Sequence, residues 1–124
     1  MSNVTASHAA YRRGEVLAAT PGQLVVLLYD GARRFLRQAS VAMRAREIER
    51  AHYALRHAEL IIAHLDGVLD DEQGGGIAEQ LHGIYRFCLL HLSHGRLQQD
   101  VSKLEQVGDL LGELRGSWAE LARR

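Results

Sequence analysis

The stretch "IERAHYALRHAELIIAHLDGVL", residues 48–69, decides the fold class. Its apolar residues recur in alternating steps of three and four, which is the spacing of a helix that packs one face against other helices. These positions are Ile48, Ala51, Leu55, Ala58, Ile62, Leu65 and Leu69. The pattern predicts a helix whose apolar stripe lines a shared core.

A helix is also predicted before this stretch, from Pro21 to about Arg44. Residues 20–23, TPGQ, are typical of a helix start, because threonine can cap, proline suits the first helical position, and glutamine completes a capping box. The expected inward residues are Leu24, Leu27, Leu28, Gly31, Phe35 and Ala39.

The middle of this helix contains Tyr29-Asp30-Gly31, which resembles a turn or an acid–base pair. The 3.6-residue period continues through it in phase, so an unbroken helix is favoured. Gly31 would let a neighbouring backbone approach closely, and Asp30 would face solvent and pair with Arg33 or Arg34. Tyr29 lies at the edge of the apolar face, where it either packs at a seam between helices or touches a partner.

Two further helices follow a loop over residues 70–76, DDEQGGG. The third is expected from about Ile77 to Leu97, and the fourth begins after a cap at Asp100 or Ser102. The inward residues are Ile77, Leu81, Ile84, Tyr85, Cys88 and Leu92 on the third helix, and Leu104, Val107, Leu111, Leu114, Trp118 and Leu121 on the fourth. The prediction is an all-α, antiparallel up-down four-helix bundle over residues 20–124, preceded by a flexible N-terminal segment, residues 1–19.

Composition argues against several classes of function. The 15 basic and 15 acidic residues give no net field for binding nucleic acid, although residues 1–63 carry an excess of arginine and residues 64–124 an excess of acid. No apolar run is long enough for a membrane span, and the first residues lack a signal peptide's apolar core. We therefore expect a cytoplasmic protein that does not insert into membranes.

Catalytic and metal sites are not indicated. The sequence has two Glu-x-x-His pairs, Glu49 with His52 and Glu79 with His82, but no His-Glu-x-x-His, and none of the expected inward residues is Glu or His. Solvated or packed histidines are therefore favoured over ligands. Cys88 falls within a core stripe, which favours an inert thiol. We expect neither an enzyme nor a cofactor.

Two helices carry apolar side chains opposite their core stripes. These candidates for a client-binding groove are Tyr53, Leu60 and Ile61 on the second helix, and Phe87, Leu90, His94 and Leu97 on the third. Scattered surface hydrophobes are common, but two adjacent outer stripes favour a groove that receives apolar helices. An empty groove of this kind can also pair with a second copy of the chain.

Three glycines at a spacing of four, Gly108, Gly112 and Gly116, stand out on the fourth helix. They cost the helix about 3 kcal/mol of propensity in total. Close approach of a partner backbone would account for them, and chance or a softer helix would do so equally well.

Several short motifs in order resemble the FliS family of flagellar secretion chaperones. They are Ala10-Tyr11, Thr20-Pro21 with Leu24, Leu28-Tyr29-Asp30-Gly31, Ile84-Tyr85, Asp100, Glu105-Gln106-Val107, Leu110-Leu111, Leu114-Arg115 and Trp118. Each motif is weak alone, but together they span nearly the whole chain.

The resemblance implies a cytosolic bundle that binds the disordered C-terminal segment of flagellin. It implies that this binding prevents premature polymerisation and keeps flagellin ready for the flagellar type III export apparatus. By the same resemblance, Tyr11 belongs to an N-terminal plug that flagellin displaces and that contacts the export gate. Pro21, Leu24, Tyr29, Asp30, Gly31 and Trp118 would be structural motif residues. The alternative is a helical adaptor or type III secretion chaperone for another client.

Overall fold

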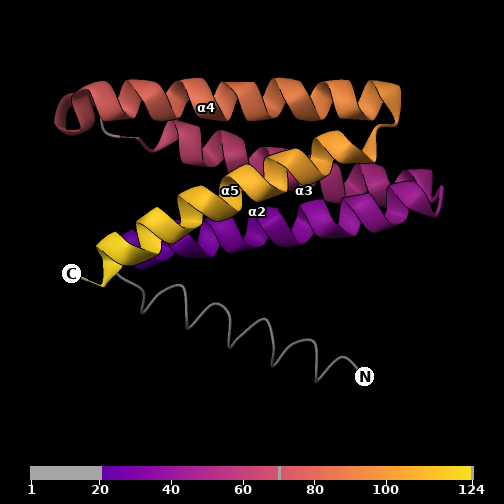
Figure 1. The fold of residues 1–124 in the computed structure, drawn as a ribbon, viewed down its shortest axis with the longest axis horizontal. Coiled ribbons are helices and arrows are strands. Elements are labelled where there is room, and N and C mark those ends of the chain that lie inside the picture. Colours follow the sequence, from indigo (N-terminus) through magenta and orange to yellow (C-terminus); the bar gives the residue numbers. More distant parts are fainter. Residues whose placement is uncertain (1–20, 70, 124) are drawn as a thin grey trace.

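The described residues form four helices that pack as a bundle. The computed structural model describes residues 21–69 and 71–123. Its helices are α2 (Pro21–Arg44), α3 (Ile48–Gly67), α4 (Asp71–Gln98) and α5 (Val101–Ala122). Helix α2 packs against α3 and α5, and α4 packs against the same two helices from the other side (Figure 1). The predicted all-α four-helix bundle is confirmed, whereas residues 1–19 and the cap Thr20 lie outside the described residues.

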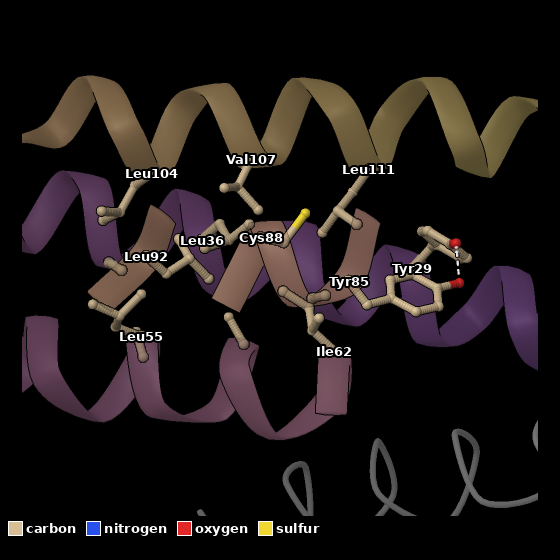
Figure 2. Close-up of a cluster of buried hydrophobic side chains, with 14 of the residues drawn as sticks. Tyr29, Leu36, Leu55, Ile62, Tyr85, Cys88, Leu92, Leu104, Val107 and Leu111 are labelled. Carbon is tan, nitrogen blue, oxygen red and sulfur yellow. Dashed lines mark hydrogen bonds between the residues drawn. The ribbon is translucent and has the colours of Figure 1, made fainter. Parts of the chain in front are cut away.

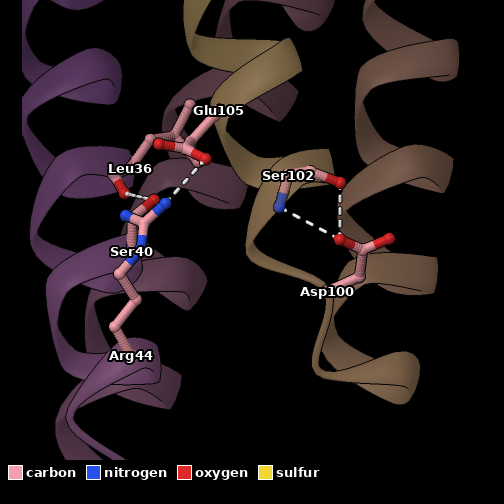
Figure 3. Close-up of polar contacts among 6 residues, drawn as sticks. All are labelled: Leu36, Ser40, Arg44, Asp100, Ser102 and Glu105. Atoms are coloured by element: carbon pink, nitrogen blue, oxygen red, sulfur yellow. Dashed lines mark hydrogen bonds and ion pairs between the residues drawn. The ribbon is translucent and has the colours of Figure 1, made fainter.

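The turns between helices follow from local backbone chemistry. Helix α2 ends at Arg44, as predicted, and Arg46 takes a left-handed conformation with φ 60° to reverse the chain. At the start of α5, the Asp100 carboxylate accepts a hydrogen bond from the Ser102 amide at 3.0 Å (Figure 3). Asp100 is therefore the N-cap, and the hydrogen bonds from Ser102 lower the pKa of its carboxyl group.

The predicted loop over residues 70–76 is largely wrong. Helix α4 already begins at Asp71 and is interrupted at Gly75, which has φ 52° and ψ −126°. Acidic residues are favourable in the first turn of a helix, and residues 71–73, DEQ, form the first turn of α4. Only the left-handed Gly75 needs a residue without a side chain, so the break is confined to one position.

The core is a layered cluster contributed by all four helices (Figure 2). Its largest fully buried side chains are Tyr29, Leu36, Leu55, Ile62, Leu65, Tyr85, Cys88, Leu92, Leu104, Val107 and Leu111. Most expected core positions of α3, α4 and α5 are confirmed. The exceptions are exposed: Ile48 and Leu121 lie at helix ends, and Ile77 follows the break at Gly75.

The core face of α2 is rotated from the predicted one. Tyr29, Ala32 and Leu36 are buried, whereas Leu24, Leu27, Leu28 and Phe35 are only partly buried. Small side chains at Ala32, Ala39 and Ala42 let α2 pack close to its neighbours. The predicted inward residues Gly31 and Ala39 are buried, but Tyr29, which was expected at the edge of the face, lies at its centre.

Polar contacts fasten α5 to α2 and α4 to α3. Arg44 Nη2 lies 2.9 Å from Glu105 Oε1, which joins one end of α2 to α5 (Figure 3). In α2 itself, the Ser40 hydroxyl donates to the Leu36 carbonyl at 2.9 Å, so this buried polar group is satisfied. On the other side of the bundle, Arg96 pairs with Glu59 and His82 with Asp66.

Candidate client-binding surface

The Tyr29-Asp30-Gly31 stretch serves the packing of the bundle. The Tyr29 and Tyr85 hydroxyls lie 2.5 Å apart, and Trp118 Nε1 donates to the Tyr29 hydroxyl at 3.2 Å. Burial raises the pKa of both tyrosines above its ordinary value, so both stay protonated at neutral pH. Of the two predicted roles for Tyr29, the structure places it at the seam between α2, α4 and α5.

Asp30 pairs with an arginine of another helix, a partner that the prediction missed. Its two carboxylate oxygens accept from Arg115 Nε at 2.8 Å and from Arg115 Nη2 at 3.3 Å. This interaction crosses from α2 to α5 and raises the pKa of the Arg115 guanidinium. The helical wheel placed Asp30 correctly on the polar face of α2. It could not show that α5 packs along the edge of that face.

Gly31 lies buried against a side chain, whereas a close backbone was predicted. A Cβ added at Gly31 would lie 3.4 Å from Ile61 Cδ1, so the glycine gives Ile61 room to pack on α2. Ile61 is consequently half-buried inside the bundle's α2–α3 seam. It is therefore a less accessible contact than the other predicted groove residues.

One glycine of the α5 stripe has a clear packing reason. A Cβ at Gly112 would lie 2.9 Å from Arg33 Nη2, and Arg33 Nε donates to the Gly108 carbonyl at 3.2 Å. The Arg33 side chain thus lies across this edge of α5. A Cβ at Gly116 would meet no atom of the described residues within 4 Å, and nothing in the structure explains that glycine.

Tyr53 belongs to an aromatic row that joins α3 to α2. The His57 ring lies 4.2 Å from the Tyr53 ring and 5.0 Å from the Phe35 ring, measured between centroids. His57 Nδ1 also lies 2.9 Å from the Tyr53 carbonyl oxygen, which fixes the ring. Tyr53 remains 60% exposed and Leu60 50% exposed. We call this set, Phe35, Tyr53, His57 and Leu60, the α2–α3 patch.

Phe87 belongs to a second group on the other side of the bundle. Its ring stacks on His91 with centroids 5.0 Å apart, and His91 Nε2 lies 2.5 Å from Gln106 Oε1 of α5. Leu90 is 59% exposed, Leu97 is 79% exposed, and His94 is also exposed. We call Phe87, Leu90, His94 and Leu97 the α4 patch. The ring contacts direct Tyr53 towards α2 and Phe87 towards α5, so we treat the candidate groove residues as two patches.

A hollow of about 440 Å³ extends the α2–α3 patch towards the α2–α3 turn. Two buried alanines, Ala42 and Ala54, lie at its base, and the exposed Val41 and Tyr53 form its apolar walls. The prediction missed Val41 because it falls among the arginines of α2. Its signal in the sequence is an apolar side chain on an otherwise polar helix face.

Among the described residues, metal-binding groups and the Cys88 thiol can be assessed directly. They contain no group of three or more His, Cys, Asp or Glu side chains that could bind a metal ion. Burial raises the pKa of the Cys88 thiol to about 11, which leaves the thiol protonated near neutral pH. Within the same residues, no helix has the length and hydropathy needed to cross a bilayer.

Comparison with known proteins agrees with this geometry. The family model of the flagellar protein FliS matches residues 2–124. The flagellar secretion chaperone FliS of Campylobacter jejuni is 30% identical over 112 residues, which cover 90% of this chain and 88% of that protein. The Salmonella typhimurium FliS is 32% identical, covering 86% and 80%, and the Bacillus subtilis FliS is 26% identical, covering 91% and 84%. The chain belongs to the FliS family, a family of flagellar secretion chaperones and not of enzymes.

Proposed function

We propose that this protein is a cytosolic chaperone that binds the disordered C-terminal segment of flagellin. By holding that segment it prevents premature polymerisation and delivers the subunit to the flagellar type III export apparatus. The observation that carries the proposal is the pair of exposed apolar patches on a bundle whose core is already filled. Membership of the FliS family supports the export role, and the two patches support a client of extended shape.

The patches suit a client that folds as it binds. Ordering a disordered segment costs several kcal/mol, so its contacts must be spread over a large apolar area. Tyr53, Phe87, Leu90 and Leu97 are each at least half exposed and offer that area on two sides of the bundle. A segment that becomes helical along one patch and continues to the other would bury both.

Delivery is assigned to the N-terminal segment, which lies outside the described residues. We propose that Tyr11 acts in a plug that covers client-binding surface in the free chaperone and contacts an export-gate component after flagellin displaces it. A tyrosine suits this reversible role, because its ring is apolar and its hydroxyl can hydrogen-bond to water or to a partner. Without a client, the uncovered patches would also support self-association.

Calorimetric titration with a flagellin C-terminal peptide tests the proposal. We expect binding with a large negative heat-capacity change, because apolar surface is buried. Phe87→Asp and Tyr53→Asp should each weaken binding at least about tenfold. The control is Ile77→Asp, which puts the same charge on an exposed apolar residue of α4 outside both patches. Absence of binding at high micromolar peptide would point to another export client.

The N-terminal role needs a separate measurement. Tyr11→Ala should bind the flagellin peptide more tightly than the unmodified chain, because it removes a competitor for the surface. The chaperone–flagellin complex carrying this change should bind less to the soluble domain of an export-gate component. Equal binding in both assays would show that Tyr11 has neither role.

A further inference from the structure

We infer that the hollow between α2 and α3 selects a client helix whose apolar face is bordered by carboxylates, with Arg37 and Arg50 as the specificity-determining residues. The inference rests on the proposed function, because it assigns one end of the client to this hollow. It goes further by stating the charge that the client must carry. Three observations support it, namely the shape of the hollow, its charges, and their contrast with the hollow between α2 and α5.

The hollow has the form of a seat for one helix face. Ala42 and Ala54 are each 1% exposed and form a shallow base, while Val41 and Tyr53 remain open to solvent beside them. Small side chains at the base leave space for the large apolar residues of a docked helix, which recur at steps of three and four. The apolar surface continues through the Tyr53–His57–Phe35 row, so the seat extends along the α2–α3 seam.

The charges around this seat are mostly positive. Arg37 lines the hollow and makes no hydrogen bond or ion pair with another residue in the described part of the chain. Arg50 pairs with Glu47 at 3.0 Å, but both side chains are largely exposed and lie at the rim. Two arginines against one glutamate favour a ligand with negative charge at its edges.

The hollow between α2 and α5 shares Arg37 with this seat, but its other charges are two arginines and two acids. It is larger, at about 550 Å³, and Glu105 and Asp109 share it with Arg33 and Arg44. Two of its arginines already bond across to α5, Arg33 to the Gly108 carbonyl and Arg44 to Glu105. Apart from Arg37, its opposite charges compensate one another, and its two carboxylates would repel an acidic flank. Arg37 lies between the two hollows and is available to a ligand in the α2–α3 seat.

A docked helix would therefore use two kinds of contact. Its apolar residues would cover Val41 and Tyr53, and an acidic residue on each flank would pair with Arg37 or Arg50. Exposed ion pairs contribute little affinity but discriminate strongly against like charge. The arginines would thus act mainly by rejecting client segments with basic flanks.

The test uses the full chain and two pairs of peptides in calorimetric titrations. One pair is the flagellin C-terminal peptide and the same peptide with Asp and Glu replaced by Asn and Gln. The other pair is a designed amphipathic helix with leucines on one face, bordered by Glu in one version and by Lys in the other. The protein variants are Arg37→Glu and Arg50→Glu, with Arg86→Glu on the exposed surface of α4 as the matched control.

We expect Arg37→Glu to weaken binding of each acidic peptide about fivefold at low salt, and less at 0.5 M salt where exposed charges are screened. The Arg50→Glu variant should also weaken binding of the acidic peptides, and the Arg86→Glu control should change their affinity less than twofold. The neutralised and Lys-bordered peptides should bind more weakly than the acidic ones to the unmodified chain. Arg37→Glu should leave binding of the neutralised peptide unchanged and should strengthen binding of the Lys-bordered peptide, because it replaces a repulsion by an attraction. Thermal melting of each variant checks that the fold is intact.

The outcomes separate this inference from the proposed function. Tight binding of the flagellin peptide that ignores its carboxylates and both arginines would overturn the inference and leave the flagellin assignment standing. Binding of the designed acidic helix with arginine dependence, but no binding of flagellin, would support the inference and overturn the flagellin assignment. If neither peptide binds, both are wrong.

Discussion

The hydroxyl oxygen of Tyr29 lies 2.5 Å from that of Tyr85, and Trp118 Nε1 donates to the same Tyr29 hydroxyl at 3.2 Å. Tyr29 is thus the middle member of a buried polar chain that connects α2, α4 and α5. A buried hydroxyl without a partner is costly, so the three aromatic residues depend on one another.

Tyr29→Phe should destabilise the protein more than Tyr85→Phe. Losing the Tyr29 hydroxyl leaves both the Tyr85 hydroxyl and the Trp118 N–H without a partner, at a cost of about 2 kcal/mol. Losing the Tyr85 hydroxyl leaves Tyr29 bonded to Trp118, at a cost of about 1 kcal/mol. Urea unfolding shows which variant loses more free energy of unfolding. Equal losses would mean that the hydrogen bond from Trp118 contributes nothing to stability.

Asp30→Asn should lower stability by about 0.5 kcal/mol at low salt, because its bond with Arg115 is bidentate but more than a third exposed. The loss should shrink in 1 M salt, where exposed ion pairs are screened. Glu113→Gln, an exposed acid on α5, is the control for a general charge effect. A double-mutant cycle that combines Asp30→Asn with Arg115→Gln should give a coupling energy close to the free energy of unfolding lost by Asp30→Asn alone.

Gly95→Ala and Gly83→Ala should have opposite effects although both lie in α4. A Cβ at Gly95 would lie 2.8 Å from Leu104 Cδ1 and 3.2 Å from Lys103 Cβ, so α5 would have to shift, at a cost of about 1–3 kcal/mol. At Gly83 an added Cβ meets no described atom within 4 Å, and alanine should stabilise by up to about 1 kcal/mol. Thermal or chemical denaturation distinguishes the two signs, and stabilisation by Gly95→Ala would contradict the close α4–α5 contact.

Alkaline pH should destabilise the bundle in part through Cys88. Its folded-state pKa is raised by burial from 9.0 to about 11, so the protonated thiol is favoured in the folded state. That contribution is fully present below pH 9 and is lost as pH rises from about 9 to 11. Cys88→Ala should therefore lose less stability across this interval than the unmodified chain. Unfolding curves at pH 8 and pH 10.5 measure the difference, after subtraction of the constant cost of the smaller side chain.

The helices were predictable from sequence because their apolar periods are long and regular. The α2 range from Pro21 to Arg44 and most of the inward residues of α3, α4 and α5 follow from that pattern alone. The rotation of the α2 core face was not predictable in this way. It depends on Tyr85 and Trp118 offering partners to the Tyr29 hydroxyl, and these lie 56 and 89 positions away.

The residues of the candidate surface could be predicted from the sequence, but their arrangement in space could not. Tyr53 and Phe87 stand out on helical wheels because each lies opposite a core stripe. Their separation into two patches depends on which neighbour each side chain meets, Phe35 through His57 for one and Gln106 through His91 for the other. A wheel describes one helix at a time and carries no information on those neighbours.

The two patches have a consequence for how a client leaves. A segment that contacts both would be bound bivalently, so the second contact forms at the high effective concentration set by the residues between them. Either contact alone can then be weak enough to open quickly while the other keeps the client tethered. A receptor that captures the first end to open could remove the client stepwise, without ever breaking all of its contacts at once.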